Sequence, residues 1–328
     1  MLLALQAAVM LSVAVACGRL ARLVRLPAVI GELFGGILLG PTWLHAFPTL
    51  SPGVDVLARI GLLCFLFAAG LEVNLDYVRR HGLAVATTSL GGILLPFATA
   101  VVAVRVAPSI WKQTLTVGHL SLFLGAALAI SALPVIARII LDLGFEKLPL
   151  ASVILASATI DDLLGWTLFA IIVGAKVPLT TITVVAFLLG ALLSRKLASR
   201  ERLRQVTIGY LAPLFFVSLG LRVDFITNFD WQLVIVVCVI ASVGKIAGVT
   251  LGARLGGFPM RQAAAIGMAM NARGAVEMVL ATVALQAQLI DTRLFVALVV
   301  MAVVTSAIAG PSMQVMLRSE APGKALTL

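Results

Sequence analysis

Long apolar runs, separated by short charged or Gly/Pro-containing breaks, follow one another along almost the whole chain. Most runs have about 20 residues, the length with which an α-helix crosses a bilayer, whereas barrel strands have about 10 residues and alternate in polarity. The pattern therefore predicts an all-α polytopic membrane protein. The eleven predicted spans cover residues 2–17, 28–44, 54–74, 83–105, 119–141, 149–173, 179–194, 206–223, 232–253, 262–286 and 293–316.

Composition agrees with this pattern. The chain is 61% hydrophobic and 12% charged, whereas a typical globular domain has about 45–50% apolar and about 25% charged residues. A net charge of +10 would indicate a nucleic-acid partner in a soluble protein. Here most charges lie in short loops, so we expect a lipid bilayer around the protein and no nucleic-acid partner.

The loop charges also predict the orientation of the chain. Most Lys and Arg residues fall in one set of alternate loops, as is typical of cytoplasmic loops, with the largest cluster at 195–204. We therefore expect an integral protein of the cytoplasmic (inner) membrane, with the N-terminus outside and the C-terminus in the cytoplasm. Lys245 and Arg273 belong to neither set of loops because they lie within predicted spans.

Two segments of the first half are weakly similar in sequence to segments of the second half. The end of the third span (FLFAAGLEVNLD) is similar to the end of the eighth (FFVSLGLRVDF), and ELFGGILLG in the second span is similar to AFLLGALLS in the seventh. By the loop charges, the paired spans run in opposite directions, which predicts an inverted repeat. We expect residues 1–328 to form a single transmembrane domain of two repeats, 1–173 and a shortened 179–317, without a soluble regulatory domain.

Inverted repeats are typical of secondary transporters, whose binding site lies near the midplane at broken helices. In the fifth span Pro134 removes a backbone donor, and Ser131 lies one turn before it; an ordinary proline kink is the alternative. Polar residues and a glycine predict a second break in the tenth span. They are Asn271, Arg273, Gly274 and Glu277. The arginine and glutamate are i,i+4 and can pair, so we expect them to support the broken helix rather than bind substrate.

Adjacent aspartates, Asp161 and Asp162, lie near the middle of the sixth span, which carries no basic residue. One carboxylate at this depth costs roughly 2.5–3.5 kcal/mol, so the pair indicates a functional site. Lys245 lies deep in the ninth span without an accompanying acid. Since adjacent helical residues point about 100° apart, one aspartate can face the lysine while the other faces a cavity. A carboxylate there can hold a proton or a small cation, and competition between them yields exchange.

Other acidic residues have simpler explanations. Glu32 and Glu72 lie close to span ends, where capping or snorkelling accounts for them. For Lys245 itself, a purely structural ion pair with Asp161 is the alternative to a role in exchange. An intramembrane aspartyl protease would need carboxylates from two helices that share a proton, and a solute symporter does not explain a lysine opposite the aspartate pair. We therefore expect a transporter and not an enzyme.

With these motifs the chain resembles the monovalent cation/proton antiporter superfamily, and within it the second branch (CPA2), which includes NapA-like sodium/proton antiporters and Kef-type relatives. The resemblance covers nearly the whole chain in family order. Its segments are PAVIGELFGGILLGP, LFAAGLEVNLD, ALAISALPVIARIILDLG, SATIDDLLGW, PLFFVSLGLRVDF, VGKIAGVTLGAR, NARGAVEMVLA and VVMAVVTSAIAGP.

The resemblance implies an NhaA-like fold with two crossed broken helices, a homodimer, and an elevator-like movement of the core. It assigns alternate cation and proton binding to Asp162, pairs Asp161 with Lys245, and adds Ser131 and Thr159 as auxiliary polar residues. An aspartate pair is the electrogenic type in this family, and Asp162 would bind the monovalent cation, Na⁺ first and K⁺ as the alternative. No cofactor is expected.

The chain departs from the family at one place. Family members have twelve or thirteen spans, and the shortage here falls between Ile172 and Thr183. This departure leaves two alternatives to a sodium/proton antiporter, which are a Kef-like potassium/proton efflux protein and a degenerate, non-transporting member of the same fold.

Overall fold

The computed structural model describes residues 2–24, 28–47, 51–71, 82–111, 116–145, 148–173, 178–193, 200–221 and 224–317. Every regular element within these ranges is a helix. Each predicted span overlaps at least one of the described helices. The helices of the first half are α1 (Leu2–Leu23), α2 (Ala28–Leu39), α3 (Pro52–Leu71), α5 (Gly82–Val106), α6 (Pro108–Trp111), α7 (Val117–Ala129), α8 (Leu133–Asp142) and α9 (Pro149–Val173).

The described elements of the second half are also helices. Its elements are α10 (Pro178–Leu193), α11 (Arg200–Val206), the π-helical turn η1 (Thr207–Leu211), α12 (Ala212–Gly220), α13 (Trp231–Leu255), α14 (Met260–Met270), α15 (Ala275–Gln286) and α16 (Thr292–Leu317). Among the described residues, α1, α5, α13 and α16 are long and apolar enough to cross a membrane by length and composition. The protein is therefore an integral membrane protein with several apolar helices.

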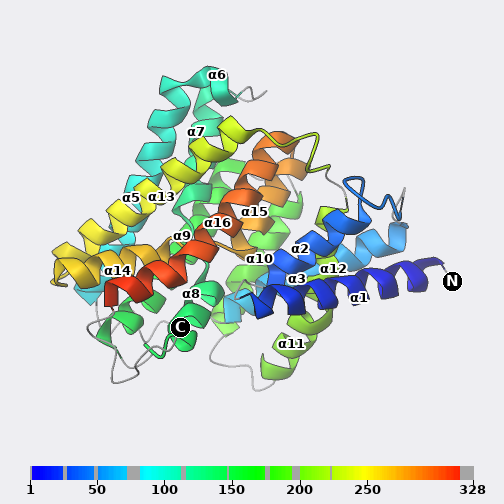
Figure 1. Ribbon diagram of the computed structural model, residues 1–328, viewed down its shortest axis with the longest axis horizontal. Coiled ribbons are helices and arrows are strands. Elements are labelled where there is room, and N and C mark those ends of the chain that lie inside the picture. The colour runs from blue at the N-terminus through cyan, green and yellow to red at the C-terminus, as the bar shows by residue number, and fades with distance from the viewer. Residues whose placement is uncertain are drawn as a thin grey trace.

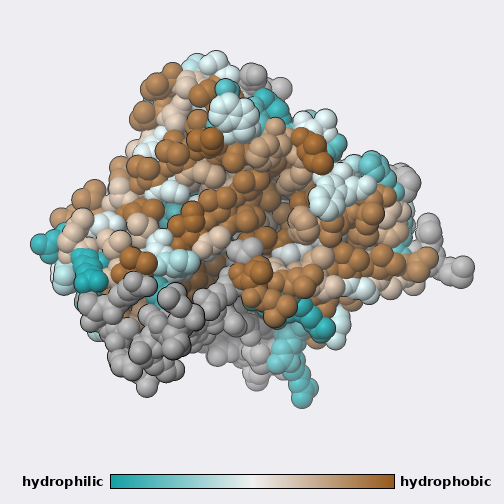
Figure 2. All heavy atoms as spheres, viewed as in Figure 1, coloured by the Kyte–Doolittle hydropathy of each residue, from teal (hydrophilic) through white to brown (hydrophobic). Residues whose placement is uncertain are grey.

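The helices form two groups (Figure 1). In one, α1, α2, α3, α10 and α12 pack on each other; in the other, α13 packs along α5 and is joined by α7, α9, α14 and α16. Hydrophobic residues cover most of the visible face of both groups, while hydrophilic residues lie mainly toward the edges (Figure 2). Such a surface is what a helix bundle presents to lipid.

Close helix crossings depend on glycine. A Cβ atom on Gly248 of α13 would lie 2.1 Å from the carbonyl oxygen of Gly91 on α5, and one on Gly252 would lie 2.1 Å from the carbonyl oxygen of Thr87. Small residues four positions apart let membrane helices approach to backbone contact. This crossing is what brings Lys245 of α13 against α5.

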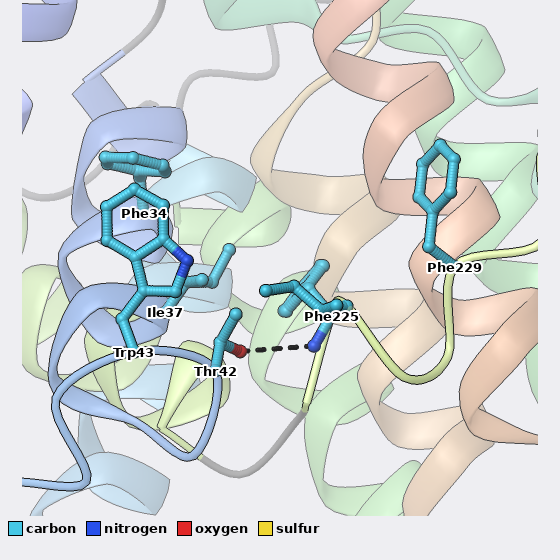
Figure 3. A pocket seen from close by; sticks show the side chains of 7 residues that line it. Phe34, Ile37, Thr42, Trp43, Phe225 and Phe229 are labelled. Carbon is cyan, nitrogen blue, oxygen red and sulfur yellow. Dashed lines mark hydrogen bonds between the residues drawn. The ribbon is translucent and has the colours of Figure 1, made fainter.

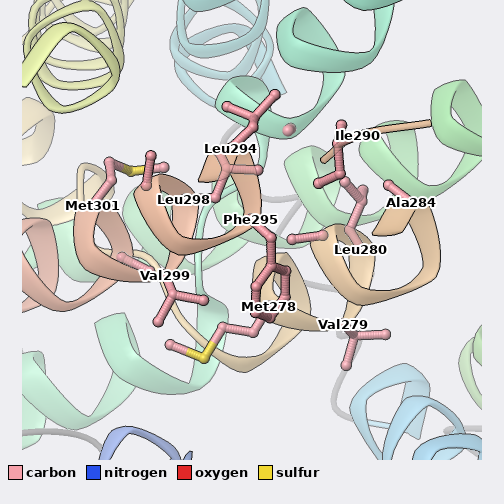
Figure 4. Close-up of a cluster of buried hydrophobic side chains, with 14 of the residues drawn as sticks. Met278, Val279, Leu280, Ala284, Ile290, Leu294, Phe295, Leu298, Val299 and Met301 are labelled. Atoms are coloured by element: carbon pink, nitrogen blue, oxygen red, sulfur yellow. The ribbon is translucent and has the colours of Figure 1, made fainter. Parts of the chain in front are cut away.

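Two helix pairs are interrupted rather than continuous. Residues 130–132 separate α7 from α8, and residues 271–274 separate α14 from α15. The two interruptions touch, since the Ala132 amide donates to the carbonyl of Ala272 over 3.0 Å. After the second interruption, side chains of α15 such as Leu280 pack against Phe295 of α16 in the main apolar core (Figure 4).

Two expected boundaries were wrong. The first interruption precedes Pro134, which lies in the first turn of α8, where the missing amide hydrogen costs little because that donor has no intrahelical partner. The first span does not end at residue 17 but continues as α1 to Leu23. Arg22 lies in that last turn, where a cation interacts favourably with the carbonyl end of the helix.

Candidate functional site

Asp161 of α9 is the centre of a buried polar cluster. Its Oδ2 atom lies 2.7 Å from Nζ of Lys245, and neither side chain is exposed. Ser131 donates to the same oxygen over 3.1 Å, and Ser89 of α5 donates to Oδ1 over 2.6 Å. The structure thus brings together the predicted aspartate, lysine and serine, and it adds a serine that was not predicted.

The ammonium group of Lys245 has an acceptor for each of its three N–H donors. Besides Asp161, these are the carbonyl oxygens of Gly92, at 3.0 Å, and Ala129. The acceptors come from α9, α5 and the end of α7. Lys245 of α13 therefore joins four helices at one point.

Asp162 occupies the next position on α9 and is only 4% exposed. Being about 100° further around the helix, its side chain leaves α9 in a different direction from that of Asp161. Thr159 is also buried, but its hydroxyl donates to the Leu155 carbonyl of its own helix over 2.8 Å. Of the two auxiliary residues that were expected, Ser131 contacts an aspartate directly, whereas the hydroxyl hydrogen of Thr159 is directed along α9.

Arg273 covers the end of α7. The last carbonyl groups of a helix have no partner within it. At the end of α7 these are the carbonyls of Ala127, Leu128, Ala129 and Ile130. Arg273 donates to Leu128 over 2.7 Å and to Ala127 and Ile130 over 3.2 Å each. Lys245 takes the remaining carbonyl, so two cations from the second half cap this helix end.

The second interruption is held by neutral groups. Ser131 donates to the Met270 carbonyl over 3.1 Å, and the Asn271 amide group donates to Ser242 over 3.3 Å. Ser306 of α16 hydrogen-bonds to both the backbone N–H and the carbonyl of Arg273. The segment is therefore fixed on both sides, by the first interruption and by α16.

The other two expected support residues also lie here. Glu277 accepts from Arg273 over 3.2 Å, and both side chains are buried. Gly274 lies where the two interruptions meet, because a Cβ atom on it would come within 2.9 Å of Val135 Cγ2 and 3.0 Å of Ala132 Cβ. A side chain at this position would push the interruptions apart.

Sequence reasoning missed Ser89, Ser306 and the backbone carbonyls that Arg273 and Lys245 bind. A serine in an apolar run is common and carries no sign of the direction it faces. The only sequence signal for Ser89 was its helical spacing on α5. Ser89 lies one turn before Gly92, beside which Lys245 passes. Within the described residues, no group of three or more His, Cys, Asp or Glu side chains is arranged to hold a metal ion.

A pocket of about 410 Å³ lies away from this cluster (Figure 3). It is lined by Phe34, Ile37, Thr42, Trp43, Phe225, Ile226 and Phe229. The Phe225 amide donates to Thr42 Oγ1 over 3.1 Å across it. Because its lining is apolar apart from one threonine, this pocket offers no charged group to a cation.

Comparison with known proteins places the chain in a family. The family model described as sodium/hydrogen exchanger, transmembrane, matches residues 9–183 and 180–319. Cation/H(+) antiporter 18 of Arabidopsis thaliana is 28% identical over 373 residues, which cover 89% of this chain and 46% of the relative. The chain thus spans less than half the length of that relative. The Na(+)/H(+) antiporter NhaS4 of a Synechocystis strain is 29% identical over 367 residues, which cover 87% of this chain and 90% of the relative.

The fold has a solved counterpart. The sodium proton antiporter MjNhaP1 from Methanocaldococcus jannaschii matches with a TM-score of 0.62 and 14% identity, covering 96% of each chain. At this identity the match shows a shared fold alone.

The comparisons also bear on the predicted shortage. The two alignments, of 373 and 367 positions, are longer than this chain of 328 residues, so both relatives contain segments that it lacks. The two matched parts of the family model meet at residues 180–183, at the edge of the interval in which the shortage was predicted. The chain belongs to the sodium/hydrogen exchanger transmembrane family, in the monovalent cation/proton antiporter superfamily.

Proposed function

We propose that this chain is a secondary active antiporter that exchanges a monovalent cation for protons across the cytoplasmic membrane by alternating access. One observation carries the proposal. Asp161 is engaged by Lys245 and two serine hydroxyls, while the adjacent, equally buried Asp162 leaves the helix in another direction. The first carboxylate has a structural partner, and the second is the exchange site.

The charge balance of the core supports a monovalent substrate. The buried charged side chains of this helix group, among the described residues, are Asp161, Asp162, Lys245, Arg273 and Glu277. Three carboxylates and two cations leave one net negative charge when all are ionised. A single proton or a single monovalent cation at Asp162 neutralises the set. Because uncompensated charge is costly at membrane depth, the site favours the loaded states over the empty one.

This charge balance determines which states of the core group can cross the membrane. Proton and cation compete for the Asp162 carboxylate, and the core group crosses between its two orientations with either ligand bound. The Asp161–Lys245 pair holds α9 against α7 and α13 during that movement. Exchange of one proton for one cation at Asp162 alone moves no net charge. The electrogenic exchange that the aspartate pair leads us to expect therefore requires a second proton to bind elsewhere in the buried cluster. We expect Na⁺ as the first cation and K⁺ as the second to be tested.

We also propose that the two halves form inverted repeats whose broken helices cross at residues 130–132 and 271–274. The packing supports this arrangement, because α3 packs against α10 while α2 packs against α12, and α7 lies on α5 as α14 lies on α13. Exchanging the halves maps each of these pairs onto the other. On this arrangement the chain has eleven spans with its N-terminus outside, and it forms a homodimer.

The test is exchange in proteoliposomes. With an imposed pH gradient, Na⁺ or K⁺ added outside should dissipate the gradient in wild type and not in Asp162→Asn. The matched control is Asp224→Asn, which removes a carboxylate from the exposed turn after α12 and should retain exchange. A membrane-potential dye in the same vesicles reports the expected charge movement. Exchange that persists in Asp162→Asn would overturn the assignment.

A non-transporting member of the fold is the second candidate. It is favoured by the shortage at residues 172–183, where the two matched parts of the family model meet. The same vesicles decide between the candidates. Wild type that binds Na⁺ or K⁺ but leaves the gradient intact with both cations would support the second candidate.

A further inference from the structure

A buried carboxyl group outside the core cluster has no assigned role. Glu32 lies in the second turn of α2, is 7% exposed, and makes no hydrogen bond or ion pair with any residue in the described part of the chain. Its surroundings do not resemble the span end at which capping or snorkelling was expected, because α1 covers it. An acid placed in this way needs a chemical explanation.

The side chain fits against a glycine of α1. A Cβ atom on Gly18 would lie 3.4 Å from Glu32 Oε1. The helices are in backbone contact beside it, since a Cβ atom on Gly31 would lie 2.1 Å from the Cys17 carbonyl oxygen. With Glu32 only 7% exposed, its carboxyl group has little contact with water.

Within the part of the chain that the structure describes, few charged groups surround Glu32. On α1 the nearest is Arg22, whose Nε donates to the Gly18 carbonyl over 3.4 Å, and whose charge acts on Glu32 from beyond ion-pair distance. The other ionisable side chains of that helix end are Cys17, which is partly buried, and the exposed Arg19. The second helix packed on α2, α12, has no titratable side chain.

This environment is compatible with two protonation states of Glu32. In one, Glu32 carries a proton and stays neutral against Gly18. In the other it is ionised, and Arg22 exchanges the Gly18 carbonyl for the carboxylate, because that carbonyl and Oε1 both lie beside the same glycine. An ionised carboxyl without such a partner would be costly at this depth.

We propose that Glu32 is a second proton-binding site, separate from the aspartates, that sets the pH dependence of exchange through the packing of α1 against α2. Proton uptake releases Arg22, and proton loss closes the Glu32–Arg22 pair. The link to exchange rests on the proposed function, whereas proton binding by Glu32 does not.

The fold connects this site to the core. One turn further along α2, a Cβ atom on Gly36 would lie 2.1 Å from the Val217 carbonyl oxygen of α12. α12 continues through the turn at 224–230 into α13, which carries Lys245. A change in the spacing of α1 and α2 is therefore transmitted through α12 to α13, whose Lys245 pairs with Asp161.

Proton binding is tested without transport. Infrared difference spectra of the purified protein between acidic and alkaline pH should contain a carboxyl C=O band that disappears in Glu32→Gln and persists in Asp162→Asn. A spectrum unchanged by Glu32→Gln would overturn the proposal, even if the protein exchanges cations. A present Glu32 band in a protein that fails to exchange would leave the site intact and contradict only the proposed function.

The link to exchange is tested by pH profiles. Glu32→Gln mimics the neutral acid, so it should retain its maximal rate and lose the pH-dependent step that Glu32 causes. Arg22→Gln should move the midpoint of that step to higher pH by about one unit, because it removes the cation that stabilises the carboxylate. In the Glu32→Gln background Arg22→Gln should have no effect, and the matched Arg19→Gln should leave the midpoint in place.

The pH profiles decide whether Glu32 controls exchange. A midpoint unmoved by Arg22→Gln, or a Glu32→Gln profile identical to that of wild type, would show that Glu32 does not control exchange. If Glu32→Gln does not yield folded protein, the midpoint shift in Arg22→Gln carries the test alone.

Discussion

The two helix interruptions differ in the charge of the groups that cap them. At the end of α7, Arg273 and Lys245 supply positive charge to four carbonyl groups. At the end of α14, the Ser131 hydroxyl and the Ala132 amide supply neutral donors to Met270 and Ala272. The two interruptions thus cap each other, but only one is capped with cations.

The difference follows from where Asp161 lies. The carbonyl end of a helix carries partial negative charge, and at the end of α7 this charge lies close to the carboxylate that shares Lys245 with Ala129. Two sources of negative charge there require cations in a medium without water. The carbonyls of Met270 and Ala272 accept only from neutral donors, and we infer that neutral hydrogen bonds suffice there. Removing a cationic cap should therefore cost far more free energy of unfolding than removing a neutral one.

The largest effect is expected for Arg273→Gln. It leaves three carbonyl groups of α7 without a cationic partner and strands the buried Glu277 carboxylate. Removing one partner of a buried pair costs about 3–5 kcal/mol, so little folded protein should be recovered in detergent by size-exclusion chromatography. The control is Glu277→Gln, which removes the carboxylate and keeps the carbonyl contacts. Equal thermal stability of the two variants would show that Arg273 does not support α7.

The next effect is expected for Lys245→Ala. Asp161 would lose its cation but keep two hydroxyl donors, Ser89 and Ser131, so we expect a loss of about 3 kcal/mol, the lower end of the range for buried pairs. Combining the change with Asp161→Asn should recover about 1–3 kcal/mol relative to the sum of the single changes. Thermal unfolding of all four proteins measures this coupling. Strict additivity would contradict a direct interaction between the two side chains.

The asymmetry between the interruptions was only partly predictable from sequence. The polar residues of the tenth span indicated the second interruption. The need of buried charges for partners of opposite sign paired Asp161 with Lys245. The i,i+4 spacing of Arg273 and Glu277 pointed to one contact of the arginine and concealed the others. Its main partners are backbone carbonyls of α7. Every residue has a backbone carbonyl, so the sequence does not show which of them a side chain binds.

Position within a helix was equally hard to predict. Pro134 indicated a broken span, but the interruption precedes it because proline is tolerated in the first turn of a helix. Glu32 lies near a span end in sequence, and only the close approach of α1 buries it. Such features arise from contacts between segments that are far apart in the chain, which the apolar pattern of each segment cannot contain.

A smaller effect is expected where the two interruptions touch. In Gly274→Ala the added methyl group would meet Val135 and Ala132 at 2.9 and 3.0 Å, and overpacking of this kind costs about 1–3 kcal/mol. The matched control is Gly310→Ala on α16, whose Cβ atom would lie 3.7 Å from its nearest neighbour. Thermal unfolding should show a lower midpoint for the first variant only. Equal midpoints would mean that the interruptions can separate without cost.

The smallest effect is expected for Ser131→Ala, which removes the neutral cap. Its hydroxyl is shared between the Met270 carbonyl and Asp161 at 3.1 Å each, and Asp161 retains Lys245, so the loss is that of one ordinary hydrogen bond, about 1 kcal/mol. Ser152→Ala at the start of α9 makes the same change where the hydroxyl only bonds back to its own helix, and it should leave the unfolding midpoint unchanged. A Ser131→Ala protein as unstable as Arg273→Gln would refute the comparison itself. It would show that the site depends on the contact between the interruptions, and that the charge of each cap is secondary.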